Sequence, residues 1–153
     1  HRGAIFSMGL FVAAVARARQ ESACPTPKDV RAAIFANWGG ALAGHEARGR
    51  SASSHGGEVL RRTGRAGARL EAALGFPSIF VAAIPALRMA RDAGLDDNAV
   101  SIHTLFTLMA AVDDTTVLFR GGLEGGSFVR DAAVAFLADG GCLRAGWFER
   151  AER

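Results

Sequence analysis

Tyrosine is absent from the 153-residue sequence, lysine occurs only at Lys28, and cysteine occurs only at Cys24 and Cys142. The two cysteines are far apart and form no Cys-x-x-Cys pair, so we expect two reduced thiols in a cytosolic protein, not a disulfide scaffold or a zinc site. Charged residues make up only 22% of the chain and hydrophobic residues 50%, which excludes a disordered chain. The length suits one domain with its own core.

The sequence also lacks the patterns of membrane spans and of β-sheets. The first apolar run, Ala4 to Ala16, is shorter than a membrane span and is followed by Arg17. We find no internal repeat and no alternation typical of strands, whereas alanine, leucine and arginine recur and favour helices. We therefore predict an all-α fold, a bundle-like single domain of several helices.

Apolar spacing and capping residues place these helices. The first, around residues 4–16, is apolar nearly all round, which predicts a position in the middle of a bundle. Thr26 and Pro27 mark the start of a second helix, whose apolar stripe consists of Val30, Ile34, Trp38 and Leu42.

Further helices are expected in the second half. A helical pattern follows Pro77 and stops at Gly94, and Asp96 or Asp97 then caps a longer helix that reaches Val112. Two more helical pieces are expected at residues 127–138 and 142–152, separated by Gly140-Gly141.

Polar residues interrupt the apolar pattern at "VDDTTVLFRGG". Adjacent carboxylates repel each other and lose hydration on burial, so Asp113 and Asp114 require an arginine, a helix N-terminus or a metal ion. One interpretation is that they end one helix and cap the next. The other is an oxygen-ligand site for Mg²⁺, with Arg120 nearby.

A second polar segment precedes Pro77, where arginines alternate with glycines. Such a pattern suits anion binding, although a solvated basic face partly neutralised by Glu58 and Glu71 is the commoner outcome. His55 could donate to a phosphate or act in acid–base chemistry. The arginines are Arg61, Arg62, Arg65 and Arg69.

Taken together, the motifs resemble the triphosphoribosyl-dephospho-CoA synthase family, that is, the ATP:dephospho-CoA triphosphoribosyltransferases. The segments that carry this resemblance are "HRGAIFSMGL", "SHGGEVLRRTGRAGARLEAALGFPSIF", "ALRMARDAGLDDNAVSIHTLFTLMAAVDDTTVLFRGG" and "FLADGG". They run through nearly the whole chain. The resemblance implies an all-α enzyme that serves citrate lyase and malonate decarboxylase by making the precursor of their acyl-carrier prosthetic group.

The implied reaction transfers the triphosphoribosyl group of ATP to 3′-dephospho-CoA and releases adenine. Mg²⁺ is the expected cofactor, the partners are small-molecule nucleotides and a downstream acyl carrier protein pathway, and the location is cytoplasmic. Neither a membrane nor a nucleic acid is expected as a partner, and the sequence sets no oligomeric state.

The resemblance also implies site residues. Asp113 and Asp114 match the acidic pair of the family, as metal ligands or catalytic base, and Glu71 matches another ligand or base. His55 joins them as a catalytic candidate. The expected phosphate or cofactor contacts are Arg65, Arg69, Arg120 and His1.

Two departures from the family pattern accompany the resemblance. Thr116 and Phe119 stand where the family usually has asparagine and histidine. The family's upstream Thr-Pro-Lys-Pro-Gly segment is not in the sequence, and His1 opens it in place of methionine, so we expect residues 1–153 to be a C-terminal part of a longer protein. The alternatives are an inactive remnant, or an arginine-rich helical module that binds nucleic acid or a partner protein.

Overall fold

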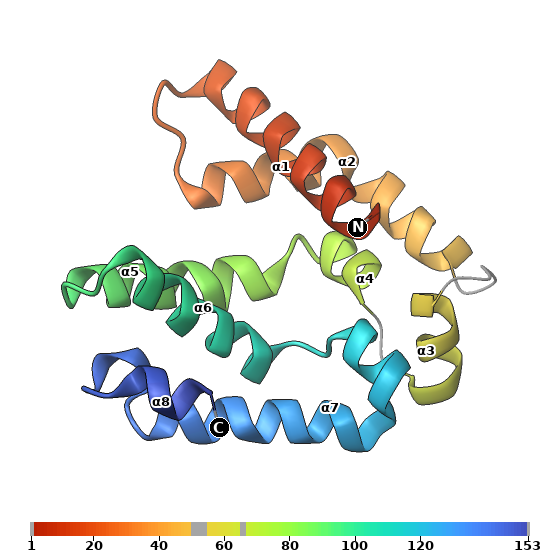
Figure 1. Cartoon of the computed structure of the whole chain (residues 1–153). Coiled ribbons are helices and arrows are strands. Elements are labelled where there is room, and N and C mark those ends of the chain that lie inside the picture. The colour runs from red at the N-terminus through yellow and green to blue at the C-terminus, as the bar shows by residue number, and fades with distance from the viewer. Residues whose placement is uncertain (1, 50–54, 65–66, 153) are drawn as a thin grey trace. The chain divides into compact units, whose positions relative to one another are not determined.

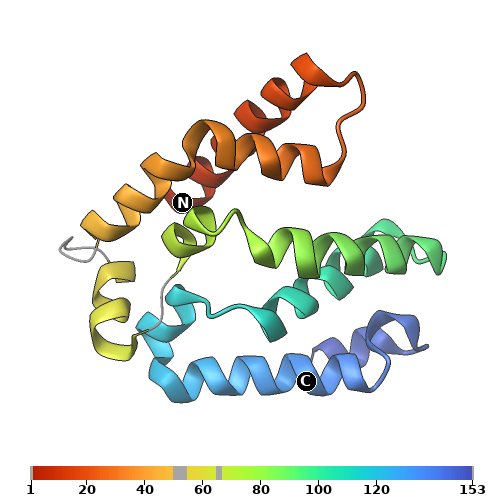
Figure 2. The same cartoon turned by 180° about the vertical axis from the view of Figure 1, so that it is seen from behind.

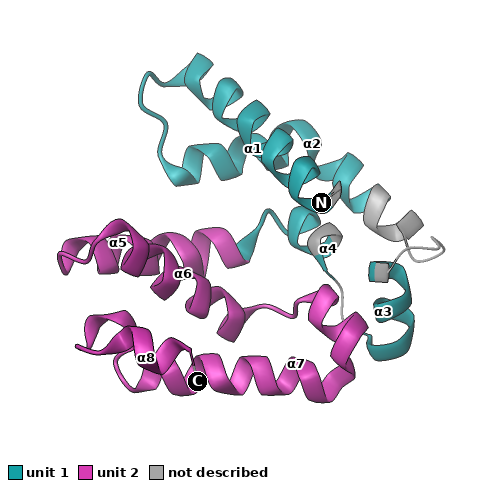
Figure 3. Ribbon diagram, in the orientation of Figure 1, with its two compact units in different colours: residues 1–77 teal, residues 78–153 magenta. Residues whose placement is uncertain are grey.

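The computed structural model describes residues 2–49, 55–64 and 67–152, with the side chains of residues 2, 45–49, 55, 68 and 69 left out. Every regular element within these ranges is a helix, which confirms the all-α prediction (Figure 1). The helices gather in two compact units, His1–Pro77 and Ser78–Arg153, coloured separately in Figure 3.

Unit 1 is built on a pair of long helices. α1 and α2 are joined by a short loop and lie side by side (Figures 1 and 2). The helices of this unit are α1 (Arg2–Glu21), α2 (Pro27–Gly49), α3 (His55–Thr63) and α4 (Ala68–Ala73).

The start of α2 follows the prediction. The backbone N–H and the hydroxyl of Thr26 both donate to Asp29 Oδ2, at 2.7 and 2.8 Å, and the Asp29 N–H donates back to the hydroxyl oxygen at 3.4 Å. The two hydrogen bonds from Thr26, that of the backbone first, lower the pKa of Asp29. This reciprocal cap fixes the helix start, and Val30, Ile34 and Leu42 of the predicted stripe are buried.

α1 differs from the prediction in one respect. Its buried residues lie on one stripe, Leu10, Ala14 and Ala18, which suits its contacts with α2 and α4. Its opposite side is about 70% exposed at Ile5, Met8 and Val12. The prediction of a helix enclosed on all sides was therefore wrong for this structure, because apolar residues all round a helix do not tell which faces have neighbours.

The glycine of the Gly-Phe-Pro segment, which follows α4, is required by the fold. Gly75 has a φ of +68°, and a Cβ there would lie 2.5 Å from the ring of Phe35. Phe76 is buried and its ring centroid lies 4.7 Å from that of Phe11. Arg31 donates to the Gly75 carbonyl at 3.1 Å, so the turn is fastened to α2.

Unit 2 begins with a π-helix, η1 (Ser78–Ala83), that continues into α5 (Ile84–Asp92). Pro85 lies in the first turn of α5 and has no N–H to donate. As predicted, the helix stops just before Gly94, whose φ is +78°. Asp96 then caps α6 (Asp97–Ala111) by accepting from the Ala99 N–H at 2.9 Å.

α7 (Thr115–Ala138) starts twelve residues earlier than the predicted piece at 127–138. The difference arises at Gly122, where φ is +63° and ψ is −163°, so two helical segments meet in a kink. This backbone conformation is accessible essentially to glycine alone. Gly122 thus marks a bend between two helical segments.

The end of the chain is also more broken than predicted. In place of one helix over 142–152 the structure has a 3₁₀ turn, η2 (Gly141–Leu143), and a short helix, α8 (Trp147–Ala151). Gly146, at the cap of α8, has a φ of +68°, which interrupts the helical pattern. Arg150 donates to the Gly141 carbonyl at 2.8 Å and so fastens the last helix to the turn.

Buried His103 of α6 lies against this turn. Its Nδ1 accepts from the Cys142 N–H at 3.4 Å, and a Cβ on Gly141 would come within 2.7 Å of the same nitrogen. Desolvation lowers the pKa of His103 from its ordinary 6.5. The Gly140-Gly141 pair therefore allows the backbone to approach a neutral imidazole closely.

None of the described helices is by itself long and apolar enough to cross a membrane. Residues 97–111 and 115–143 together satisfy the length and composition criteria, with a bend of 60° between them.

The kink in α7 can be tested by exchanging its two glycines. We expect Gly122→Ala to destabilise unit 2 by about 1–3 kcal/mol, because a side chain is strained at this φ and ψ. Gly121→Ala is the matched control: it lies in helical backbone with no atom near its Cβ, so it should be neutral or slightly stabilising. Urea unfolding followed by circular dichroism measures both, and equal effects would contradict the kink.

His103 gives a pH dependence with a defined sign. Its folded-state pKa lies below its unfolded value, so the unfolded chain binds more protons and stability falls as the pH drops through about 6.5. His103→Asn keeps an acceptor for the Cys142 N–H but does not titrate. Denaturant midpoints between about pH 7 and pH 5 should therefore fall more steeply for the parent chain than for the variant; parallel curves would rule out this role.

Candidate active site

The break between α6 and α7 positions the two adjacent acids. Val112 ends α6 in extended backbone, and Asp114 is the N-cap of α7. Its Oδ1 accepts from the N–H groups of Thr116, at 2.6 Å, and Val117, at 3.4 Å. These bonds satisfy free amides at the helix start, so the capping interpretation is confirmed for Asp114.

Asp113 is compensated in another way. Its Oδ1 accepts a hydrogen bond from Arg130 Nη2, forming an ion pair whose side chains are 23% and 35% exposed, respectively. The sequence indicated a need for a cation here but did not single out Arg130. Helical periodicity could not have found it, because the kink at Gly122 lies between the two residues.

Arg120, which the sequence analysis placed near the acids, is exposed on the first part of α7. It makes no ion pair with any side chain in the described part of the chain. Thr116 contributes its backbone N–H to the cap, a contact that does not depend on its side chain.

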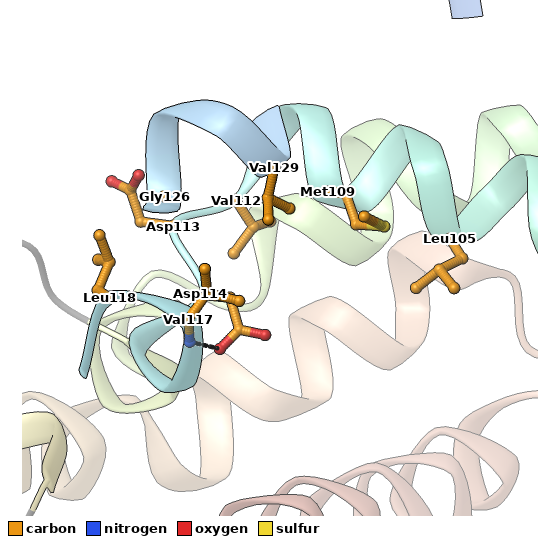
Figure 4. Close-up of a pocket in the computed structure, with 9 residues that line it drawn as sticks. All are labelled: Leu105, Met109, Val112, Asp113, Asp114, Val117, Leu118, Gly126 and Val129. Atoms are coloured by element: carbon orange, nitrogen blue, oxygen red, sulfur yellow. Dashed lines mark hydrogen bonds between the residues drawn. The ribbon is translucent and has the colours of Figure 1, made fainter. Parts of the chain in front are cut away.

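A pocket of about 270 Å³ adjoins this break (Figure 4). Among the described residues that line it, Asp113 and Asp114 are the only acidic ones and none is basic. Figure 4 shows the two carboxylates pointing to opposite sides of the backbone that joins α6 to α7. The remaining lining residues are Leu105, Met109, Val112, Val117, Leu118, Gly126 and Val129.

The walls come from α6 and α7, and the two segments of α7 approach each other closely. A Cβ on Gly126 would lie 2.6 Å from Leu118 Cδ2, so the glycine lets the two segments of α7 meet beside the pocket. Leu118 is buried, whereas Leu105 at the other end is 48% exposed. The pocket is thus an apolar recess with carboxylates as its charged groups.

The predicted Mg²⁺ site can be compared with this arrangement. Among the described residues, no group of three or more histidine, cysteine, aspartate or glutamate side chains could hold a metal ion. The two carboxylates diverge, and one oxygen of each already has a protein partner. They do not form a shared ligand pair here, and Mg²⁺ stays a prediction.

The other predicted site residues belong to unit 1. Glu71 lies in α4 and is partly buried. His55 begins α3 and Arg69 lies in α4, but their side chains are outside the described set. His1 and Arg65 lie outside the described residues altogether. The roles of these five residues stay predictions.

The arginines of α3 partly fit the interpretation as a solvated basic face. Arg61 and Arg62 are exposed, and Arg62 Nη1 lies 3.5 Å from Glu58 Oε1, one helical turn away. Exposed pairs of this kind contribute little to stability, about 0.3–0.5 kcal/mol. No described contact singles these residues out as a nucleic-acid surface.

Comparison with known proteins adds evidence independent of this geometry. The family model for ATP:dephospho-CoA triphosphoribosyl transferase matches residues 1–153. A probable 2-(5″-triphosphoribosyl)-3′-dephosphocoenzyme-A synthase of Azotobacter vinelandii is 43% identical over 92% of this chain and 46% of its own length. The synthase of Pectobacterium atrosepticum is 39% identical over 90% of this chain and 46% of its own length.

A third relative, the probable synthase of Pseudomonas syringae, is 38% identical over 94% of this chain and 47% of its own length. The chain thus spans about half the length of the curated relatives that it matches, and no solved structure matches it. These matches do not support the alternative of an arginine-rich binding module. Because the family model covers every residue, the chain belongs to the ATP:dephospho-CoA triphosphoribosyl transferase family.

Proposed function

We propose that the protein of which residues 1–153 are all or part transfers the triphosphoribosyl group of ATP to a hydroxyl of 3′-dephospho-CoA and releases adenine. The observation that carries this proposal is the family match over the whole chain. The pocket beside Asp113 and Asp114 supports it, because carboxylates stabilise the positive charge that develops at a sugar carbon during such a transfer.

The step balances as a substitution at C1′ of the ATP ribose. The bond from C1′ to the adenine nitrogen breaks, and the nitrogen keeps the electron pair and gains a proton. The CoA hydroxyl oxygen bonds to C1′ and loses its proton to a base. The transition state resembles an oxocarbenium ion, whose positive charge a nearby carboxylate stabilises.

In this proposal Asp113 supplies that carboxylate, and Arg130 holds it in place from the second segment of α7. Arg130 is a positioning residue, since its role is exerted through Asp113. Glu71 and His55 are the further acid–base candidates.

The triphosphate needs positive charge, which the described residues of the pocket lining do not provide. Arg120 is exposed and is not among the lining residues. With Arg65, Arg69 and His1 it forms our set of candidates for the phosphates. Mg²⁺ would supply further charge on the phosphates, but no step above depends on it.

The wider setting follows from the substrates. The product would be the prosthetic-group precursor for an acyl carrier protein of citrate lyase or malonate decarboxylase. We propose the cytoplasm as the location, where ATP and dephospho-CoA are available together.

The activity can be tested on the full-length gene product. With ATP, Mg²⁺ and 3′-dephospho-CoA, we expect stoichiometric release of free adenine, measured by liquid chromatography, and a CoA derivative heavier by one triphosphoribosyl group. Omitting dephospho-CoA is the control and should stop the release. If no adenine appears with all substrates present, the assignment is wrong for this protein and the inactive remnant is favoured.

The Asp113–Arg130 pair makes a sharper prediction. Asp113→Asn should lower kcat by about 100-fold or more, in the range found for positioned acid–base groups. Arg130→Met should lower kcat with little change in KM for ATP, and the double variant should be no slower than Asp113→Asn alone, because the two residues act as a unit.

The matched control for Arg130→Met is Arg144→Met, which removes an exposed arginine paired with Asp139 elsewhere in unit 2. It should leave kcat unchanged. Multiplying effects in the double variant would show that Arg130 does not act through Asp113.

A further inference from the structure

The pocket beside the acids has a lining that selects among the parts of the proposed substrates. The described part of its walls is aliphatic apart from one thioether, and the charged residues there are both carboxylates. A triphosphate placed there would be repelled and would lose hydration without a compensating cation. A neutral, flat, mostly apolar group with an N–H donor fits this chemistry better.

The pocket's size narrows the choice. Its volume of about 270 Å³ is slightly below the range of about 300–1,000 Å³ typical of sites for drug-sized ligands. It therefore suits one fragment of a nucleotide and not a whole one. A bicyclic base between the walls of α6 and α7 is such a fragment.

One acceptor is available for that base. Asp114 Oδ1 receives the two backbone amides of α7, whereas Asp114 Oδ2 has no hydrogen-bond partner among the described residues. Asp113 also lines the pocket, but its Oδ1 is occupied by Arg130. A carboxylate oxygen accepts and does not donate, so its partner must carry an N–H.

We infer that this pocket takes the adenine base of ATP, with the exocyclic amino group donating to Asp114 Oδ2. This inference rests on the proposed function and deepens it. The triphosphoribosyl group that is transferred contains no part of the base, so a preference for ATP must come from contacts with the base before it leaves. The apolar walls shield the base from water, and the carboxylate recognises its amino group by accepting a hydrogen bond from it.

Two nucleosides without phosphates isolate this contact: adenosine, and purine riboside, which lacks only the amino group. Isothermal titration on the full-length gene product should give adenosine about tenfold or greater preference, the size expected of a hydrogen bond to a charged group. Asp114→Ser keeps a good N-cap but shortens the side chain. In this variant the two nucleosides should bind about equally.

A second pair of variants tests the walls without disturbing the core. Leu105→Trp fills one end of the pocket from a position that is 48% exposed, and Leu143→Trp makes the same change at a 45% exposed position of η2 outside the pocket. We expect Leu105→Trp to weaken adenosine binding about tenfold or more and Leu143→Trp to leave it unchanged.

The outcomes separate this inference from the proposed function. Equal binding of the two nucleosides to the parent protein, a preference that survives in Asp114→Ser, or binding of pantetheine in place of adenosine would overturn the adenine pocket, even if adenine release is observed. Selective adenosine binding that the variants alter as predicted, without adenine release in the presence of dephospho-CoA, would support the pocket and contradict the transfer reaction.

Discussion

The break between α6 and α7 depends on compensation of two neighbouring negative charges. Asp114 is stabilised by the free amides at the start of α7 and Asp113 by the guanidinium of Arg130. The first interaction is local, but the second requires the chain to bend back after one short helical segment. Gly122 provides that bend, and the recess lined by both helices lies beside it. The acids, the kink and the pocket are therefore one structural unit.

Local signals were sufficient for much of the fold. Thr26 and Asp96 cap the helices that the sequence assigned to them, and Gly94 follows the end of α5. Each of these features depends on residues within about two helical turns. Such interactions can be recognised without knowledge of the tertiary structure.

Features that depend on distant residues were not predicted. The pairing of Asp113 with Arg130 follows from the direction in which Gly122 turns the chain, which two consecutive glycines do not specify. The sequence predicted that an arginine, a helix N-terminus or a metal ion would compensate the acids. It did not show that the helix N-terminus would stabilise Asp114 and an arginine Asp113. It also could not tell that α1 would leave Met8 exposed.

The motifs that carry the family resemblance differ in what they explain. Gly75 and Gly141 are required where a side chain would collide with Phe35 or His103, so their segments have a reason in the fold alone. The acidic segment is different, because capping accounts for only one of its two carboxylates. The second carboxylate pairs with Arg130, and the adjoining apolar recess is the feature for which the fold by itself gives no need.

The central claim, that ATP binds beside this break, can be tested with the three methionines of the chain. Met109 lines the pocket, while Met89, in the same unit, and Met8, in the other, do not. With ¹³C-labelled methionine methyl groups, titration with ATP should shift the Met109 resonance in the NMR spectrum and leave that of Met89 in place. A shift of Met89 with Met109 unchanged would contradict the account.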